Sequence, residues 1–336
     1  SVLGSCLSHE DLLVPTTNPF LLPPALVAAR PLHGKTVVPL VYDLYPDALE
    51  AAGSIDPGSL LSRGLSQLNR FVFQQADGVV FIGHRMAEHA IERYGEPRRW
   101  TVIETGADAS EFEPHLNGAQ GAESELEAWC DSKDVVASYV GNMGVMHDWE
   151  TLALACQRWA ERADAHRLGI VIRASGGGAA QLQEACDKLA GDFIRFADPL
   201  DNRAWARLLT RTDISLVTLR PEARRTCIPS KAFSAMAAES ALLAIAPADS
   251  DLAALVRRHD CGEVVPPGDV EAAVAPLEHW LDQPARLAEE KAAARDALLE
   301  NYDMPRLAER WVDFLEDCRR RPSESRRTLY RAVKRV

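Results

Sequence analysis

The sequence predicts an α/β protein made of two Rossmann-like lobes, each with an open parallel sheet covered by helices. Short apolar, β-branched segments alternate with helical segments of ten or more residues, which is typical of parallel strands joined by crossover helices. This alternation occurs in two sets, separated by a polar stretch at about 114–134. At 336 residues and 47% hydrophobic, the chain is long enough to bury two cores.

The first set spans 1–113 and forms the N-terminal lobe. Its four candidate strands are short apolar runs bounded by turns, as expected of buried parallel strands. They lie at 11–17, 35–41, 78–82 and 101–104, with helices from Asn18-Pro19 to about Arg30, over 59–75 and over 84–94. Residues 1–8 have the pattern of a helix end, so we expect this lobe to be incomplete at its N-terminus.

The second set predicts a complete Rossmann-like domain over 135–283, after a linker at 114–134. Six candidate strands lie at 135–140, 169–174, 193–196, 214–219, 241–246 and near Val264. Residues 284–318 are predicted to form terminal helices, which either stay with this lobe or return to the first. A basic tail follows at 319–336.

Composition argues against several classes of protein. The formal net charge of -12 argues against general nucleic-acid binding, because the phosphate backbone would be repelled. No run of about 18 apolar residues occurs, so no membrane span is predicted. The seven cysteines are odd in number and lack metal-ligand spacing, which indicates a reducing, cytoplasmic compartment.

The tail at 319–336 contrasts with this acidic chain. It carries eight basic residues and one acidic residue, with Leu329, Val333 and Val336 at helical spacing. Such a segment can rest on an anionic membrane surface, at about 1 kcal/mol per basic residue. It is equally consistent with a solvated tail or a helix that packs on the first lobe. Peripheral attachment to the inner face of the plasma membrane therefore stays one of these alternatives.

The most informative segment is Ile228-Pro229-Ser230-Lys231, which precedes an apolar helical run at 232–238. A helix N-terminus beside a lysine ammonium can hold a phosphate or diphosphate without a metal. Just upstream, Arg220, Arg224 and Arg225 add three guanidinium groups. The alternatives are an ordinary helix start with a solvated lysine, and arginines that pair with surface carboxylates. We expect the second alternative for at least one arginine.

The loop after the first strand of the second lobe is another candidate. Gly141-Asn142-Met143-Gly144 lets backbone amides approach a ligand, and a helix starting near Asp148 would direct its positive end at a diphosphate. His147 would add a charge that depends on pH near neutrality. Alone, the sequence Gly-Asn-x-Gly is a tight turn, and His147 is equally a hydrogen-bonded residue at the helix start. Residues 175–178, Ser-Gly-Gly-Gly, are expected to be structural.

The order of segments from about 11 to 315 resembles a retaining glycosyltransferase of the GT-B fold, family four, in a divergent bacterial subgroup that keeps Pro-Ser-Lys. The resemblance is carried by 141–144, 228–231, the strand at 241–246 and the turn at 265–269. It implies two lobes facing a cleft, with a nucleotide sugar on the second lobe and the acceptor on the first. It also implies no metal and no cofactor, only a nucleoside-diphosphate sugar as co-substrate, which we expect to be UDP-linked.

The resemblance further implies a role for each candidate residue. The catalytic residues are Lys231 and Arg225, which stabilise the leaving diphosphate, and Asp43, which orients the sugar or stabilises charge. Before Tyr45-Pro46, Asp43 can equally be a turn former. The acceptor side is lined by Asn18 and Tyr42. The donor-binding residues are Gly141, Asn142, Gly144, His147, Asp198, Arg220, Arg224, Ser230 and Ser234, and relatives hold the base where Asp198 lies.

The chain departs from the family pattern at three positions. Many family-four enzymes carry two glutamates eight positions apart, and Thr226 and Ser234 occupy those positions here. Ser234 can still bond a ribose hydroxyl, less strongly than a charged acceptor. Glu239 stands where relatives commonly have glycine.

The leading prediction is an enzyme that moves a sugar from a nucleoside diphosphate to a glycan or polyprenyl-linked acceptor in bacterial surface polysaccharide synthesis. The missing glutamates keep a second class open, a non-catalytic relative that binds nucleotide sugars or a partner transferase. A nucleotide-sugar 2-epimerase shares the two-lobed architecture and is the third hypothesis. It would need converging carboxylates and histidines, and the sequence identifies no such set.

Overall fold

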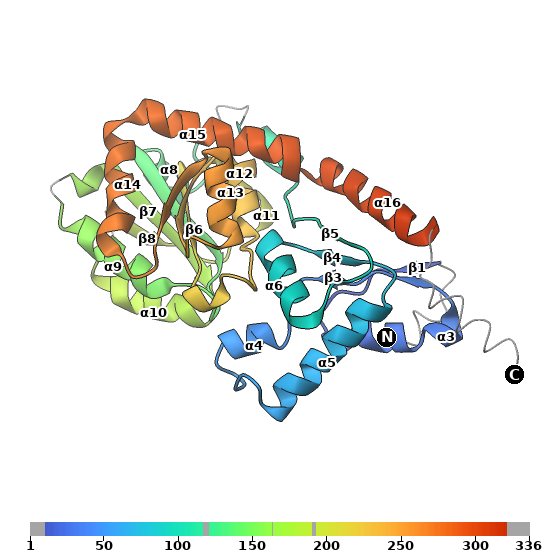
Figure 1. The fold of residues 1–336 in the computed structure, drawn as a ribbon. Coiled ribbons are helices and arrows are strands. Elements are labelled where there is room, and N and C mark those ends of the chain that lie inside the picture. Colours follow the sequence, from blue (N-terminus) through green and yellow to red (C-terminus); the bar gives the residue numbers. More distant parts are fainter. Residues whose placement is uncertain (1–10, 117–120, 163, 190–192, 321–336) are drawn as a thin grey trace, which may run out of the picture. The chain divides into compact units, whose positions relative to one another are not determined.

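The fold is described from a computed structural model, for residues 11–116, 121–162, 164–189 and 193–320. Its contacts divide the chain into two compact units. Unit 1 comprises Ser1–Glu104, Arg225–Ile228 and Leu307–Val336, and unit 2 comprises Thr105–Arg224 and Pro229–Arg306. Each unit combines helices with parallel strands (Figure 1), which confirms the predicted fold class.

Unit 2 contains a six-stranded parallel sheet in the order β11-β10-β9-β6-β7-β8. The strands are β6 (Val135–Asn142), β7 (Leu168–Ser175), β8 (Ile194–Phe196), β9 (Ile214–Thr218), β10 (Ala241–Ile245) and β11 (Gly262–Val265). All six predicted strands of the second set are confirmed. The chain passes from β6 to β7 on one side, and β9 adjoins β6 on the other. The carboxyl ends of β6 and β9 therefore form the topological switch point, where open α/β sheets bind ligands.

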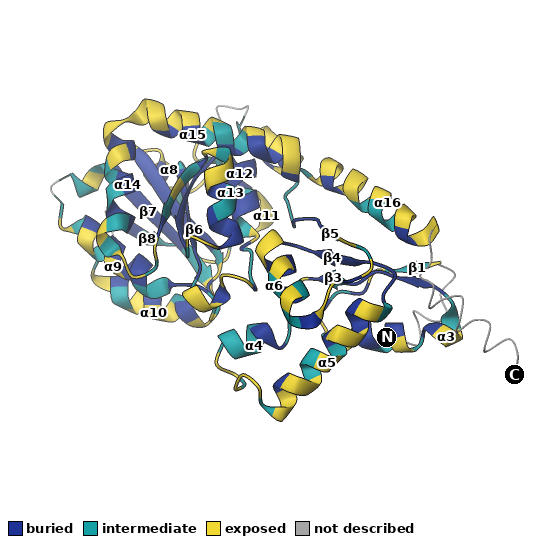
Figure 2. Cartoon of the chain, viewed as in Figure 1, coloured by how far each residue is buried: buried dark blue, intermediate teal, exposed yellow. Residues whose placement is uncertain are grey.

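Helices cover both faces of this sheet. They are α7 (Glu113–Leu116), α8 (Glu125–Cys130), α9 (Trp149–Ala160), α10 (Gly177–Cys186), α11 (Asn202–Thr210), α12 (Lys231–Ala237), α13 (Asp251–His259), α14 (Val270–Asp282) and α15 (Pro284–Ala297). Alternate strand residues pack with α9, α10 and α14 around the buried Trp159 and Trp280. Figure 2 shows the result, with buried strands and helices that are exposed along one side.

Unit 1 has shorter strands in two sheets. β1 (Leu12–Leu13) pairs with β2 (Thr36–Val37), and β3 (Leu40–Val41), β4 (Val79–Phe81) and β5 (Trp100–Val102) form the other sheet. The single strand predicted at 35–41 is thus two strands with different partners. They are separated at Val38-Pro39, because proline has no N–H to donate to a ladder.

The helices of unit 1 are α2 (Leu22–Ala28), α3 (Arg30–His33), α4 (Asp47–Ala51), α5 (Leu60–Gln75), α6 (His84–Tyr94) and α16 (Met304–Arg320), the last from Leu307 onward. α6 has the predicted bounds, and α5 begins after Ser59, whose hydroxyl caps it by accepting from Ser62 N. α4 was not predicted. Five residues are too few to show a helical period.

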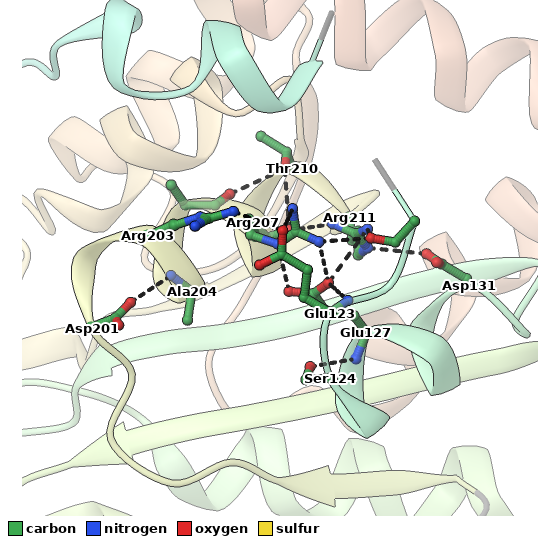
Figure 3. A network of polar contacts seen from close by, with 12 residues as sticks. Glu123, Ser124, Glu127, Asp131, Asp201, Arg203, Ala204, Arg207, Thr210 and Arg211 are labelled. Carbon is green, nitrogen blue, oxygen red and sulfur yellow. Dashed lines mark hydrogen bonds and ion pairs between the residues drawn. The ribbon is translucent and has the colours of Figure 1, made fainter. Parts of the chain in front are cut away.

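The structure corrects the predicted domain boundary, which lies at 104/105 rather than at 113. The predicted linker at 114–134 packs within unit 2. Figure 3 shows how Glu127 of α8 meets Arg207 of α11, with the Arg207 Nε 2.8 Å from the Glu127 Oε1. Just before this segment, the rings of Phe112 and Trp205 lie 5.2 Å apart between centroids. Polar composition hid these contacts, because the partners lie some 80 residues downstream.

The predicted terminal helices divide between the units. α15 packs on β10 and α12 in unit 2, whereas Leu307, Trp311, Phe314 and Cys318 of α16 pack with Val38, Val80 and Ile103 in unit 1. The predicted helix end at 1–8 and the basic tail beyond Arg320 lie outside the described residues. Across the described residues, no helix combines the length and apolar character that a membrane crossing requires.

Candidate active site

The ammonium of Lys231 lies at the carboxyl end of β6. Lys231 is the first residue of α12, and its Nζ donates to the Tyr139 hydroxyl at 2.6 Å and to the Asn142 carbonyl at 2.9 Å. The same nitrogen lies over the Tyr139 ring, 4.2 Å from its centroid. Lys231 is therefore held on the sheet rather than extended into solvent, contrary to the alternative of a solvated lysine.

Gly141 adopts a backbone conformation that favours glycine beside this contact. Its φ of +136° is rare for residues that carry a side chain, and a Cβ there would lie 3.6 Å from the Lys231 Cε. Asn142 is exposed, and its carbonyl also accepts a hydrogen bond from the Tyr139 hydroxyl at 3.1 Å. The structure thus brings Gly141, Asn142 and Lys231 together, and their binding of a donor stays a prediction.

His147 lies beneath this group and is 8% exposed. Its Nδ1 is 2.7 Å from the Thr218 carbonyl at the end of β9, and its Nε2 is 3.5 Å from the Lys231 Nζ. Since a carbonyl only accepts, Nδ1 carries the proton and Nε2 faces the ammonium as an acceptor. Burial, and then the Lys231 charge, lower the pKa of His147 to about 4. His147 is thus neutral at physiological pH, which corrects the expectation of a charge that varies there.

The glycine-rich loops after β6 and β7 hold each other in place. Met143 N donates to the Ser175 carbonyl at 2.6 Å, and Gly178 N donates to the Met143 carbonyl at 2.9 Å. A Cβ on Gly176, whose φ is +93°, would lie 2.3 Å from the Asn142 Oδ1. Gly144 belongs to the same loop, and a Cβ there would lie 3.2 Å from the Asn142 Nδ2. These contacts support the structural role expected for 175–178.

Two helix starts differ from the prediction. α9 begins at Trp149, and the Asp148 carboxylate caps it by accepting from Thr151 N at 3.0 Å. A carboxylate therefore already occupies the positive end that was expected to face a diphosphate. At α12, Ala232 N and Phe233 N donate to the carbonyls of Pro229 and Ser230. Attraction for an anion here consequently rests on the Lys231 ammonium more than on helix amides.

Ser230 and Ser234 lie on either side of this helix start. Ser230 is exposed and precedes α12 without a side-chain cap, and Ser234 is half-buried within the first turns. Both belong to unit 2 with Lys231. That these two hydroxyls bind the donor stays a prediction.

Each of the three arginines near this helix has a carboxylate partner. Arg220 pairs with Glu150 at 2.5 Å and donates to the His147 carbonyl, which braces the loop after β6. Arg224 lies 3.3 Å from Asp249 within unit 2. Arg225 lies 3.7 Å from Glu92 within unit 1. The expectation that at least one arginine pairs with a surface carboxylate thus holds for all three.

The acceptor-side candidates belong to unit 1. Tyr42 N and Asp43 N both donate to the buried Thr17 Oγ1 at 3.0 Å, so Thr17 orients the turn that carries Asp43. Burial raises the pKa of the Asp43 carboxyl. Asn18 is exposed before a cis proline, and its carbonyl accepts from the Thr16 hydroxyl. The three predicted catalytic residues thus fall in both units, Asp43 and Arg225 in unit 1 and Lys231 in unit 2.

Asp198 is exposed after β8 and lines a pocket of about 540 Å³, together with residues of α8 and α11. Its donor-binding role stays a prediction. Sequence reasoning missed Tyr139 and Thr17, because both lie in segments that were interpreted only as strands. Across the described residues, no cluster of three or more His, Cys, Asp or Glu side chains could hold a metal ion.

Comparison with known proteins supports the fold. No family model matches the chain. The chain is 27% identical over 268 residues to WbjE of Pseudomonas aeruginosa, a probable glycosyltransferase, covering 80% of this chain and 65% of that protein.

Among solved structures, sucrose-phosphate synthase of Thermosynechococcus elongatus matches with a TM-score of 0.71 at 14% identity, covering 94% of this chain and 75% of that one. HepE of Anabaena in complex with UDP matches with a TM-score of 0.72 at 12% identity, and the match covers 94% of this chain and 80% of that one. A UDP-forming trehalose-phosphate synthase of Burkholderia xenovorans, in complex with glucose-6-phosphate, matches with a TM-score of 0.72 at 15% identity. This match covers 94% of this chain and 76% of that one. The chain therefore has the GT-B fold of these glycosyltransferases.

Proposed function

We propose that this protein is a retaining, metal-independent glycosyltransferase of family four. It transfers a sugar from a UDP-sugar to a glycan or polyprenyl-linked acceptor in bacterial surface polysaccharide synthesis. The observation that supports this most is the Lys231 ammonium, held over Gly141 and Asn142 at the switch point of the unit 2 sheet. The resemblance to WbjE and to UDP-utilising enzymes supports the same class.

The chemistry requires stabilisation of a leaving diphosphate. As the bond between the sugar and the diphosphate breaks, negative charge grows on the diphosphate oxygens, and a fixed ammonium lowers that barrier. The acceptor hydroxyl forms the new bond to the sugar, and its proton passes to the leaving phosphate. Lysine suits this role because its charge is compact and its stem is flexible.

Lys231→Ala tests the proposal. Release of UDP from a panel of UDP-sugars is measured for the full chain, with Lys188→Ala as the control, because Lys188 is an exposed lysine of unit 2 outside the site. We expect Lys231→Ala to lower turnover by about 100-fold or more. Lys188→Ala should match the wild type. Full turnover in Lys231→Ala would reject the site.

A non-catalytic relative is the second candidate, favoured by Thr226 and Ser234 at the glutamate positions. Binding of UDP-sugars without release of UDP, with or without acceptor, would favour it. Release of an epimerised sugar without acceptor would instead favour the 2-epimerase.

A further inference from the structure

Tyr139 makes the closest contact to the Lys231 ammonium among the hydrogen bonds described for it. Its hydroxyl accepts from Nζ at 2.6 Å and donates to the Asn142 carbonyl at 3.1 Å, and that carbonyl accepts from Nζ at 2.9 Å. Nζ, the hydroxyl and the carbonyl thus form a closed triangle of hydrogen bonds. A charged donor makes such bonds stronger than neutral pairs.

The tyrosine itself is fixed. Tyr139 is fully buried, and alternate residues of β6 anchor it in the core cluster of unit 2. Its ring packs edge-to-face on His147, with 6.3 Å between centroids, and His147 is fixed in turn by the Thr218 carbonyl. A lysine has four side-chain torsions and loses much freedom when it is held, so a rigid partner on the sheet matters.

We propose that Tyr139 is the positioning residue of Lys231: its hydroxyl and ring hold the ammonium at the carboxyl end of β6, where it meets the diphosphate of the donor. This inference rests on the proposed function for the identity of the ligand. The hydrogen bonds among Tyr139, Asn142 and Lys231 that support the inference do not depend on a ligand. The strand pattern alone gives no hint of this role, because Tyr139 fits the apolar run of a buried strand.

The first test needs no substrate. The full chain is labelled with a limiting amount of acetic anhydride, and acetylation of Lys231 is measured by mass spectrometry for the wild type, Tyr139→Phe and Tyr302→Phe. Tyr302→Phe is the matched control, because Tyr302 is also a buried tyrosine. Its hydroxyl forms a hydrogen bond with His259, and its ring packs on Phe233 of α12, the helix that carries Lys231. We expect Lys231 in Tyr139→Phe to react about threefold faster or more, and Tyr302→Phe to match the wild type. Equal labelling in Tyr139→Phe and the wild type would overturn the proposal.

The second test is a double-mutant cycle on UDP affinity, measured by calorimetry. Tyr139→Phe should weaken UDP binding by about tenfold when Lys231 is present, and should have no further effect in Lys231→Met. A tyrosine that served only the fold would weaken binding equally in both backgrounds, and that result would overturn the proposal. If the wild type binds no UDP, the proposed function fails and the labelling result alone decides the role of Tyr139.

Discussion

Glu239 has a strained backbone conformation at a position where relatives commonly have glycine. Its φ is 61°, in the left-handed region, and it follows Ala238, the C-cap residue of α12. Ser240 N donates to the Ala235 carbonyl at 3.0 Å, a helix ending that requires a left-handed residue at Glu239. Relatives were expected to carry glycine here, and the structure supplies the physical reason, because only glycine adopts this conformation without cost.

Glu239→Gly should therefore stabilise the protein. We expect the free energy of unfolding to rise by about 1 kcal/mol, measured by urea denaturation. Glu239→Ala is the control, since it removes the carboxylate and keeps the Cβ. An equal gain in both variants would mean that the side chain, and not the backbone, is responsible.

His147 leads to a prediction about pH. Its pKa in the folded protein is about 4, below the ordinary 6.5, so the unfolded chain binds more protons between these values. The stabilisation is complete above pH 6.5 and is lost as the pH falls toward 4. Between pH 8 and pH 5, the wild type should lose about 2 kcal/mol of unfolding free energy more than His147→Gln does. Urea denaturation at both pH values measures this difference, and an equal loss in the two proteins would contradict it.

At the scale of elements, α8 illustrates what sequence patterns miss. Isolated helices of six residues do not form, so α8 depends on its tertiary contacts. Arg207 of α11 and Glu127 of α8 form a two-pronged ion pair whose side chains are 1% and 7% exposed (Figure 3). Bonding to Arg207 lowers the pKa of Glu127 to about 2. Charged residues in a polar stretch gave no sign of such burial.

Glu127→Gln should destabilise unit 2, because it removes the buried carboxylate that accepts two hydrogen bonds from the Arg207 guanidinium and leaves the half-exposed Glu123 as its carboxylate partner. We expect a larger loss of unfolding free energy than for the same change at Glu123. Glu123→Gln makes the same chemical change on the other carboxylate of this network, which pairs with Arg203 and Arg207 but is 51% exposed, and should cost less than about 1 kcal/mol. Similar losses for the two variants, measured by urea denaturation, would show that the buried pair is not what holds α8.

Longer elements were predictable because their periodicity is set by burial. The strands β6, β9 and β10 of unit 2 are nearly continuous buried runs, as expected when both faces of a sheet are covered. α6 combines an apolar stripe with a glycine directly after its last residue. By contrast, the strand interrupted at Pro39 required knowledge of its two different partners.

At the scale of the whole molecule, the order of strands and helices predicted the fold, but not the side-chain partners within it. The cluster of arginines was expected to attract an anion, yet Arg220, Arg224 and Arg225 pair with carboxylates from other segments. Those partners are distant in sequence, and no local pattern identifies them. The diphosphate-binding role of Lys231 stays a prediction, and the hydrogen bonds to Tyr139 and Asn142 hold its ammonium at the edge of the sheet where open α/β sheets bind ligands.

The proposed role of the Lys231 ammonium is to bind the diphosphate of a UDP-linked donor. The most direct measurement is calorimetric titration of the full chain with UDP and with uridine, for the wild type and Lys231→Met. We expect the wild type to bind UDP more tightly than uridine, and Lys231→Met to lose about tenfold or more of its affinity for UDP while its affinity for uridine is unchanged. Equal UDP affinity in the wild type and Lys231→Met would contradict this role of Lys231.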